Sequence, residues 1–488
     1  MVAQLDELIS RSRLRLNDLD RLRELGIVAK GADFSPSGVH YPPITKYSPI
    51  SEDEMFAGYR MPPDGRLDVY AHIPFCKTRC TFCHYPLKLG PKMVEEKDRY
   101  LAALEKEMDL YLRRLGIDRI KPRSILVGGG TPTFLTPVQF RRFLESFNKR
   151  VDLLASSQFS YDVDPNTLIG PDGEERLRMM RDFGVHRLTI GIQSLNPEVL
   201  RLMNRHHGRN EALEAIEASK KAGFQVNIEF IFGYPGQTLE NWAEVVDEAC
   251  RLDVEEIQLY RLKVEAYGDY QGPIKQVLEK KKQPVPTNED AIVMKQLAIE
   301  ILDQHGYREE ILRRVFTRHP EHYSHYAHNQ CCRLVDEVGF GLTAFSSLVD
   351  RFVLNTADFD EYYAKIEAGH LPVNRGLVRS KEDLARWAVV LPLKNRTIRE
   401  RDFQRVTGGI SLKDVFPEKM RLLKEAGLVT DTKWGVSLTT LGRFFADETV
   451  QQFFEPDHLP FPADDYMPGP LHPLNNNQLF GSTLIAAE

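Results

Sequence analysis

The stretch Tyr70-Ala-His-Ile-Pro-Phe-Cys-Lys-Thr-Arg-Cys-Thr-Phe-Cys-His-Tyr85 places three of the six cysteines of this chain within eight residues, directly after an apolar run. These cysteines, Cys76, Cys80 and Cys83, have the spacing C-x3-C-x2-C. Thiolates are soft ligands that suit iron–sulfur clusters and zinc. A structural zinc site normally takes four ligands in two separated pairs, and the sequence contains no second C-x2-C pair. Three cysteines on a four-iron cluster would leave one iron open to a substrate or cofactor, so the spacing favours a cluster over zinc.

Length and composition narrow the class of protein. At 488 residues the chain has room for a large catalytic domain and one or two smaller ones. Its 42% apolar and 27% charged residues are ordinary for a soluble globular protein. The formal net charge of -6 gives no basic footprint for nucleic acid, and no run approaches the roughly 20 apolar residues of a membrane span. We therefore expect a cytoplasmic enzyme with a small-molecule substrate and without a nucleic-acid or membrane partner.

From residue 67 onward, strand-like and helix-like patterns alternate. Apolar, strand-like runs occupy residues 67–73, 124–128, 159–164, 187–192, 225–232 and 256–262. Amphipathic, helix-like stretches occupy residues 94–115, 137–149, 173–183, 210–222, 238–252 and 288–304. This alternation predicts an α/β fold with a parallel sheet and helices outside it. In such sheets the chemistry gathers at the carboxyl ends of the strands.

The same patterns divide the chain into segments. We expect an N-terminal arm over residues 1–66, the strand–helix repeat over 67–305, and an extension on the substrate side over 306–380. A small helical C-terminal domain is expected over 381–455, and an irregular tail over 456–488.

Two of the predicted strands end in residues suited to ligand binding. Gly129, Gly130 and Thr131 follow the second strand in a Gly-Gly-Gly-Thr-Pro run, and glycines let the backbone approach a ligand closely, although a tight turn needs similar residues. Asp162 and Asp164 end the third strand at positions i and i+2, which share one face. Capping of the following helix is the alternative role for these carboxylates.

The next three strands end in polar residues as well. Gln193 offers both a donor and an acceptor, and Arg205 can pair with a carboxylate through two hydrogen bonds, unless it is a solvated surface residue. Glu229 lies in the fifth strand. Tyr260 and Arg261 end the sixth strand on opposite faces, so at most one of them lines the interior.

The C-x3-C-x2-C spacing is the signature of radical S-adenosylmethionine (SAM) enzymes. Over roughly residues 65–450 the chain resembles the oxygen-independent coproporphyrinogen III oxidase-like, or HemN-like, family of these enzymes. The resemblance implies a partial (βα)6 radical SAM barrel and a winged-helix-like C-terminal domain. It also implies a [4Fe–4S] cluster on Cys76, Cys80 and Cys83, and reductive cleavage of SAM to a 5′-deoxyadenosyl radical. An electron donor such as flavodoxin or ferredoxin would then be a partner.

The same resemblance assigns further residues to SAM binding. Asp162 stands where relatives usually have glutamate, and Glu229 stands where they commonly have aspartate. The full set of implied SAM contacts is Tyr70, Phe82, Gly129, Gly130, Thr131, Asp162, Gln193, Arg205, Glu229 and Arg261.

One departure bears on the substrate. Coproporphyrinogen oxidases of the family carry a fourth cysteine two residues after the third, and this chain has Tyr85 there. We therefore favour the class C branch of methyltransferases and cyclopropanases, which use two SAM molecules and act on an sp2 carbon of a natural-product-like small molecule. The alternatives are an anaerobic coproporphyrinogen III dehydrogenase-like or haem-processing enzyme, and a haem-binding chaperone.

The segment after the barrel offers a weaker signal. His319, His322, His325 and His328 recur every three residues, which fits neither a zinc pair nor a helix face, so polar loop residues near the substrate are favoured over a second metal site. The neighbouring Cys331 and Cys332 suggest no role. The Gly339–Ser346 element resembles the family segment next to a second SAM or the substrate.

Overall fold

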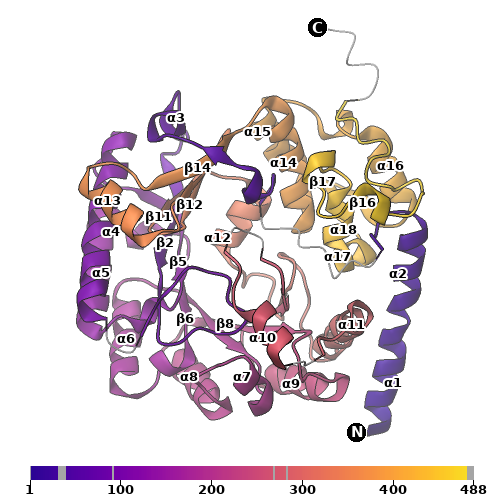
Figure 1. Ribbon diagram of the computed structural model, residues 1–488, viewed down its shortest axis with the longest axis horizontal. Coiled ribbons are helices and arrows are strands. Elements are labelled where there is room, and N and C mark those ends of the chain that lie inside the picture. The colour runs from indigo at the N-terminus through magenta and orange to yellow at the C-terminus, as the bar shows by residue number, and fades with distance from the viewer. Residues whose placement is uncertain (1, 31–39, 91–92, 267–269, 282–283, 481–488) are drawn as a thin grey trace.

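Six parallel strands form the centre of the fold (Figure 1). The structure is a computed structural model, and it describes residues 2–30, 40–90, 93–266, 270–281 and 284–480. They lie in the order β2-β5-β6-β7-β8-β9. Their bounds are β2 Arg66–Ile73, β5 Lys121–Gly129, β6 Phe159–Val163, β7 Arg187–Gln193, β8 Gln225–Phe232 and β9 Glu256–Arg261. The helices between and after them are α4 Val94–Leu115, α5 Pro137–Arg150, α6 Gly170–Asp182, α7 Pro197–Leu202, α8 Arg209–Lys221, α9 Leu239–Arg251, α10 Ile274–Lys281 and α11 Asn288–Gln304. The predicted α/β fold is confirmed, and the six strands and the long helices lie close to their predicted ranges.

Local sequence explains where these helices begin and end. The hydroxyl of Thr136 accepts the backbone N–H of Gln139 at 3.3 Å, and the Gln139 side chain accepts the backbone N–H of Thr136 at 3.3 Å. This reciprocal cap starts α5. α4 ends at Gly116, which has a φ of 67° that glycine adopts without strain. Since each helix starts only after the loop that follows its strand, those loops collect at the carboxyl edge of the sheet.

The sheet extends beyond the six predicted strands on both sides. β11 (Glu337–Phe340) pairs parallel with β2, and it is followed outward by β12 (Phe345–Leu348), β13 (Arg351–Asn355), β14 (Val373–Val378) and β1 (Ser48–Pro49), all antiparallel. On the other side β10 (Val315–Thr317) pairs antiparallel with β9. The result is a sheet of twelve strands in which β1 and β10 are the two edges. The short helices that accompany this extension are α3 Glu52–Phe56, α12 His325–His328 and α13 Phe359–Glu367.

The residues after β14 form a second body with its own apolar core. Its helices are α14 Lys381–Lys394, α15 Glu400–Thr407, α16 Pro417–Glu425, α17 Thr440–Phe444 and α18 Ala446–Gln451, and its sheet is β15 Thr397–Arg399, β17 Gly435–Leu438 and β16 Val429–Thr432, in that spatial order. Leu19 and Leu22 of the N-terminal helix α2 (Arg15–Glu24) are buried in this core, together with Ile292 of α11. In Figure 1, α2 lies beside this C-terminal body, and α1 (Val2–Arg13) continues down past α11.

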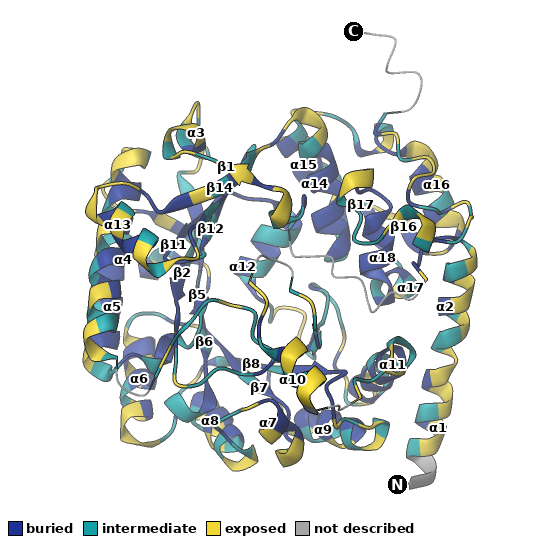
Figure 2. Ribbon diagram, in the orientation of Figure 1, coloured by how far each residue is buried: buried dark blue, intermediate teal, exposed yellow. Residues whose placement is uncertain are grey.

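Buried residues follow the strands and the inner faces of the helices, whereas the outer faces of α5 and α8 are exposed (Figure 2). None of the helices in the described residues combines the length and the apolar character that crossing a bilayer would require.

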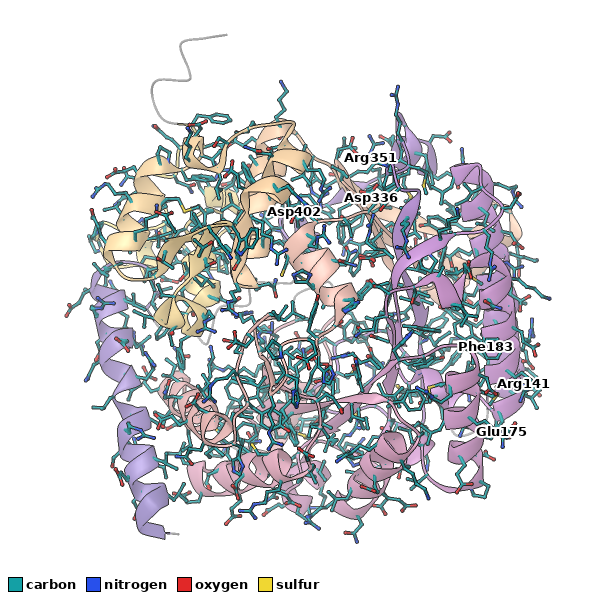
Figure 3. The ribbon with its side chains drawn as sticks, turned by 180° about the vertical axis from the view of Figure 1, so that it is seen from behind. Arg141, Glu175, Phe183, Asp336, Arg351 and Asp402 are labelled. Atoms are coloured by element: carbon teal, nitrogen blue, oxygen red, sulfur yellow. The ribbon has the colours of Figure 1, made fainter. Side chains whose placement is uncertain are left out.

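Polar contacts join the C-terminal body to the sheet near Asp336 and Asp402, which are labelled in Figure 3. Asp336 accepts a hydrogen bond from the Tyr59 hydroxyl at 2.8 Å, and burial raises its pKa to about 6. Arg405 lies between the two acids: it pairs with Asp402 at 3.9 Å and donates to the Leu334 carbonyl at 3.1 Å. The hydrogen bond from Arg405 to Leu334 thus joins the C-terminal body to the segment that precedes β11.

The segment after α18 is irregular but packs closely over its described part. The backbone N–H of Leu471 donates to the carbonyl of Leu25 at 2.9 Å. The backbone N–H of Lys30 donates to the backbone carbonyl of Asp465 at 2.5 Å. A Cβ on Gly26 would lie 2.6 Å from the carbonyl oxygen of Met467, so the tail and the end of α2 are in direct contact.

Candidate functional site

The three cysteines of the loop after β2 lie close to one another and to the end of β5. Cys76 ends the short strand β3 (Phe75–Cys76), and its sulfur lies 3.4 Å from the Thr131 hydroxyl. The backbone N–H of Cys83 donates to the carbonyl of Cys80 at 3.2 Å. All three thiols are free. Burial raises the pKa of Cys76 to about 12, and the neighbouring Cys83 and Cys80 raise it further, so three thiolates here require a positive group among them.

Three cysteine thiols are a donor set that suits a cluster of several irons. A lone zinc draws each sulfur to about 2.3 Å, whereas a cluster with one cysteine on each of three irons holds its cysteines farther apart. The three thiols and the positive side chain beside them, described below, therefore suit an iron–sulfur cluster.

The glycines after β5 are required by close approach to this loop. A Cβ on Gly130 would lie 2.8 Å from the carbonyl oxygen of Phe75 and 3.0 Å from the sulfur of Cys76. A Cβ on Gly129, whose φ is 117°, would lie 2.9 Å from the His72 ring. One on Gly128 would lie 2.5 Å from the Asp162 carboxylate. The run thus lets the backbone pass directly beside the cysteines, as a ligand-binding turn must.

Arg205 links the cysteine loop to the ends of two strands. Its guanidinium donates to the sulfur of Cys80 at 3.2 Å, to Asp164 at 2.9 Å and to the carbonyl of Gly191 at 2.6 Å. Burial alone would raise the pKa of Asp164, but Arg205 and His206 outweigh it and lower that pKa to about 2. Arg205 is therefore a buried, fully engaged cation and not a solvated surface residue. Asp164 also caps the turn that follows it, through the backbone N–H of Asn166 at 3.1 Å.

Asp162 and Glu229 are two further acids of the barrel, and both have raised pKa values. Burial, together with the charge of Glu229, raises the pKa of Asp162 to about 7. Burial also raises the pKa of Glu229, which accepts a hydrogen bond from the Tyr260 hydroxyl at 3.2 Å. The protonated form of Asp162 can donate a hydrogen bond to a hydroxyl-bearing ligand, and its ionised form can accept one.

Tyr85 faces these acids from the cysteine loop. Its side chain is 59% exposed, yet loss of bulk water raises its pKa, and Cys83, Glu229 and Asp162 raise it further. The residue in the fourth-cysteine position therefore lies near enough to the candidate site for its charges to act on it, and it brings a phenol there, not a thiol.

Gln193 has the backbone geometry of a functional position. It ends β7 at a register shift and has a φ of 72°, which is rare for a residue with a side chain. Such strain persists where the surroundings enforce it, and it is common at ligand sites. The side chain turns back over Gly191, whose added Cβ would lie 3.0 Å from its amide nitrogen.

Four rings pack against one another and form what we call the aromatic wall: those of Tyr70, Phe345, Phe352 and His40. The rings of Tyr70 and Phe345 are stacked with centroids 6.4 Å apart, and those of Phe345 and Phe352 are stacked at 5.1 Å. The centroid of the His40 ring lies 4.6 Å from the ring centroid of each of these phenylalanines. The Tyr70 hydroxyl also lies 2.9 Å from Nδ1 of His72, and burial lowers the pKa of this imidazole to about 4. The wall is thus anchored next to the glycine run.

Glu107 ties α4 to the segments that flank β12 and β13, and it was not among the residues singled out from the sequence. It accepts hydrogen bonds from the backbone N–H of Gly341 at 2.8 Å, from Asn355 at 2.8 Å and from the Tyr362 hydroxyl at 2.6 Å. Burial raises its pKa to about 7, although these bonds lower it in part. The available signal was one carboxylate within the apolar face of α4, beside Leu104 and Met108.

The remaining predicted contacts lie around the site in different ways. Phe82 packs against the apolar cluster that contains Met203 and Tyr234. Arg261 donates to Asn288 at the start of α11 at 2.9 Å, and it passes within 3.7 Å of a Cβ placed on Gly233. It therefore lies on the other side of β9 from Tyr260, as the strand register requires.

The histidine segment lies at the opposite end of the sheet from most of these residues. His325 Nδ1 lies 3.0 Å from the Ser157 hydroxyl, ahead of β6. Tyr326 donates to the buried carboxylate of Glu337, and its ring lies 6.2 Å from that of Tyr70. Cys331 and Cys332 are both removed from bulk water, which raises their pKa values.

Comparison with known proteins agrees with this geometry. Residues 70–249 match the model of the radical SAM superfamily, a span that runs from Tyr70 through the cysteines to α9. The chain carries a radical SAM domain. Radical SAM proteins use a [4Fe–4S] cluster and SAM, and the three cysteines and the glycine run of this domain fit that pair of cofactors.

Similarity continues beyond the radical SAM domain. The chain is 25% identical over 445 residues to the oxygen-independent coproporphyrinogen III oxidase of Escherichia coli K12, covering 86% of this chain and 92% of that protein. It is 26% identical over 412 residues to the enzyme of the same name from Pseudomonas aeruginosa, covering 79% of this chain and 85% of that protein. It is 25% identical over 392 residues to the heme chaperone HemW of Bacillus subtilis, covering 79% of this chain and 98% of that protein.

A solved structure shows that the fold is shared as well. Coproporphyrinogen III oxidase (HemN) from Escherichia coli superposes with a TM-score of 0.71 at 24% identity, over 85% of this chain and 96% of that one. The names of these relatives favour the alternatives of tetrapyrrole oxidation or haem chaperoning. They do not support the methyl-transfer and cyclopropanation activities that the sequence first favoured.

Proposed function

We propose that this radical SAM enzyme acts on a tetrapyrrole that carries carboxylate side chains, of the coproporphyrinogen kind. The observation that carries the proposal is the aromatic wall, which begins at Tyr70 beside the cysteine loop and extends through Phe345. Offset-stacked rings offer a flat apolar face to pyrrole rings. Full-length similarity to oxygen-independent coproporphyrinogen III oxidases supports the same substrate class.

The residues divide the work of holding the cofactors. When bound, the cluster and SAM supply the one-electron chemistry of the family. Cys76, Cys80 and Cys83 would ligate iron, and Arg205 places a fixed positive charge 3.2 Å from one of these sulfurs. Gly129 and Gly130 would hold the amino-acid part of SAM through their backbone groups, because a side chain at either position would displace His72 or the cysteine loop.

The polar groups of the barrel would hold the sugar of SAM. The carboxyl groups of Asp162 and Glu229, whose pKa values burial raises, would bind ribose hydroxyls, and Gln193 is fixed at the adjacent strand end. Thr131, Phe82, Tyr70 and Arg261 complete the proposed contacts. The apolar wall would keep water away from a reactive substrate radical.

A second candidate function is methyl transfer with two SAM molecules. Tyr85 favours it, because a tyrosine replaces the fourth cysteine of the coproporphyrinogen oxidases and faces the candidate site. The Gly339–Ser346 segment supports it as well, since β11 places this segment directly beside Tyr70.

One anaerobic experiment separates these functions. The reconstituted protein is incubated with dithionite, coproporphyrinogen III and methyl-deuterated SAM, and the tetrapyrrole and nucleoside products are analysed by mass spectrometry. Loss of carboxyl groups with unlabelled 5′-deoxyadenosine supports the proposed function. Deuterated 5′-deoxyadenosine with a methylated product supports the two-SAM function and overturns the first. Stoichiometric haem binding in a parallel titration, without any product, would identify a chaperone.

A further inference from the structure

A cluster of buried basic side chains lies where the barrel meets the C-terminal body. It is centred on Asp447 of α18 and contains Lys263, Arg313, Arg314 and Lys394. Arg313 pairs with one oxygen of Asp447 at 2.7 Å, and Lys394 pairs with the other at 2.9 Å. Arg314 reaches the first oxygen at 3.4 Å. The Asp447 carboxylate thus pairs with three cations. Two of them lie just before β10 of the main sheet, and the third ends α14 of the C-terminal body.

The other acids nearby do not balance this charge. Glu309 and Glu448 are the remaining acids among the charges that act on this cluster, and Lys295 lies among them as a fifth cation. Among these described residues, whose charges act on one another, five are basic and three are acidic. Burial and the neighbouring arginines lower the pKa of Lys394 to about 8 and that of Arg314 to about 10, although Asp447 acts in the opposite direction on both. The cluster is one that an added anion would stabilise.

The backbone at Arg314 supports a binding role. Its φ is 69°, in the left-handed region that a residue with a long side chain rarely adopts. The backbone N–H of Leu259 in β9 donates to its carbonyl at 3.0 Å, and its own N–H donates to Glu309 at 2.5 Å. Strain of this kind is held by the surrounding structure and is concentrated at ligand sites. Arg314 is also the most exposed cation of the Asp447 pairs, at 26% for its side chain.

The position of the cluster connects it to the candidate site. Lys263 follows β9 by two residues, at the carboxyl edge where the cofactor-binding residues gather. Tyr260, three residues before Lys263, donates a hydrogen bond to Glu229 at 3.2 Å, and the charge of Arg314 also acts on its phenol, so Tyr260 lies between Glu229 and the cations. A ligand anchored on the cations can therefore extend past Tyr260 toward the cysteine loop.

We propose that Arg314, Lys263 and Lys394, held by Asp447, form the subsite that binds the carboxylate groups of the substrate. Arginine forms paired hydrogen bonds with carboxylates, and its charge is not lost at any physiological pH. The C-terminal body would then supply part of the substrate site through Lys394 and Asp447. The subsite rests on the proposed function only for the identity of the carboxylate-bearing ligand.

The test compares Arg314→Gln with two matched variants in the full-length, cluster-loaded protein. Arg314→Lys keeps the charge, and Arg308→Gln removes a cation six residues away that is 46% exposed and paired with Asp303. One probe is coproporphyrin III, measured by fluorescence titration beside its uncharged tetramethyl ester. The other is benzene-1,3,5-tricarboxylate, measured by the rise it causes in the melting temperature.

We expect Arg314→Gln to weaken coproporphyrin III binding by about 10- to 100-fold, the usual effect of losing a charged hydrogen bond. Arg314→Lys should weaken it by only a few-fold, Arg308→Gln should not change it, and the ester should bind all four proteins equally weakly. The tricarboxylate should stabilise the wild type but not Arg314→Gln.

The outcomes distinguish the subsite from the proposed function. If Arg314→Gln binds coproporphyrin III as tightly as the wild type does, the subsite is wrong and the tetrapyrrole function is untouched. If the tricarboxylate stabilises the wild type alone while coproporphyrin III binds neither protein, the subsite stands and the tetrapyrrole assignment falls. Equal stabilisation of both proteins by the tricarboxylate, or none of either, overturns the subsite.

Discussion

The guanidinium of Arg205 lies 3.2 Å from the sulfur of Cys80, across 125 residues of sequence. The same side chain is tied to Asp164 and to the end of β7, so one cation connects the cysteine loop to two strand ends. A positive group beside a thiolate stabilises the charged form. The loop and the barrel therefore share a common electrostatic anchor.

Replacing Arg205 with alanine should weaken SAM binding by about 10-fold or more, because the change removes a charged hydrogen bond and leaves Asp164 with only His206 and the backbone N–H of Asn166 as partners. Cluster loading should persist, since all three cysteines remain. Equilibrium binding of SAM and the cluster absorbance measure the two effects. Arg201→Ala, on the exposed side of α7, is the matched control. Unchanged SAM affinity in Arg205→Ala would remove Arg205 from the proposed set.

Each of Cys76→Ala, Cys80→Ala and Cys83→Ala should abolish both the cluster absorbance and the formation of 5′-deoxyadenosine. Iron content, visible absorbance and nucleoside analysis provide the measurements. Cys250→Ala, which changes a buried cysteine of α9, should retain both. A variant of the triad that keeps cluster and product would refute the ligand assignment.

Gly130→Ala should prevent stable cluster loading even though it alters no ligand. The new Cβ would lie 2.8 Å from the Phe75 carbonyl and 3.0 Å from the Cys76 sulfur, so the cysteine loop would have to move. Gly208→Ala serves as the control, because the nearest atom there is the flexible end of Glu211 at 3.0 Å. Iron content per chain is the measurement, and equal loading in both variants would contradict the close-approach argument.

Glu107→Gln should destabilise the fold in a pH-dependent way. The folded-state pKa of Glu107 is about 7 against an ordinary 4.5, so folding favours the protonated acid. The stability that this provides is fully present below about pH 4.5 and is lost as the pH rises through about 7. The advantage of the wild type over Glu107→Gln should therefore shrink across that window, by at most about 1.4 kcal/mol per pH unit.

Denaturant unfolding from pH 4.5 to pH 8 follows this difference. Glu105→Gln, two residues earlier on the same helix and paired with Arg142 at 3.1 Å, is the control for a general effect of charge on α4. A constant difference between the wild type and Glu107→Gln across the range would show that the acid does not titrate as its burial requires.

The sequence was sufficient to predict the parallel strands and the cysteine loop because both signals are local. β2 and β8 are eight-residue strands with an apolar residue at every second position, and the three cysteines that follow β2 lie within a span of eight residues. The extension of the sheet was not predictable in the same way. β11 has only four residues and pairs with a strand more than 260 positions earlier, so no short-range pattern marks it.

The supporting residues of the site were missed for a related reason. Glu107 acts on Gly341 across 234 residues, and Arg314 meets Asp447 across 133. Where partners lie far apart in the chain, only the folded arrangement reveals which polar residue is paired.

The pairing of β11 with β2 also sets a lower limit on how short a working piece of this polypeptide can be. A truncation after Gln304 would preserve the cysteines and six strands, yet it would strip β2 of its outer neighbour and leave that strand's backbone amides and carbonyls facing water. Unprotected margins of this kind recruit other chains and lead to precipitation. A recombinant fragment meant to retain soluble iron–sulfur protein must therefore continue at least to Val378, where the antiparallel strands that shield β2 come to an end.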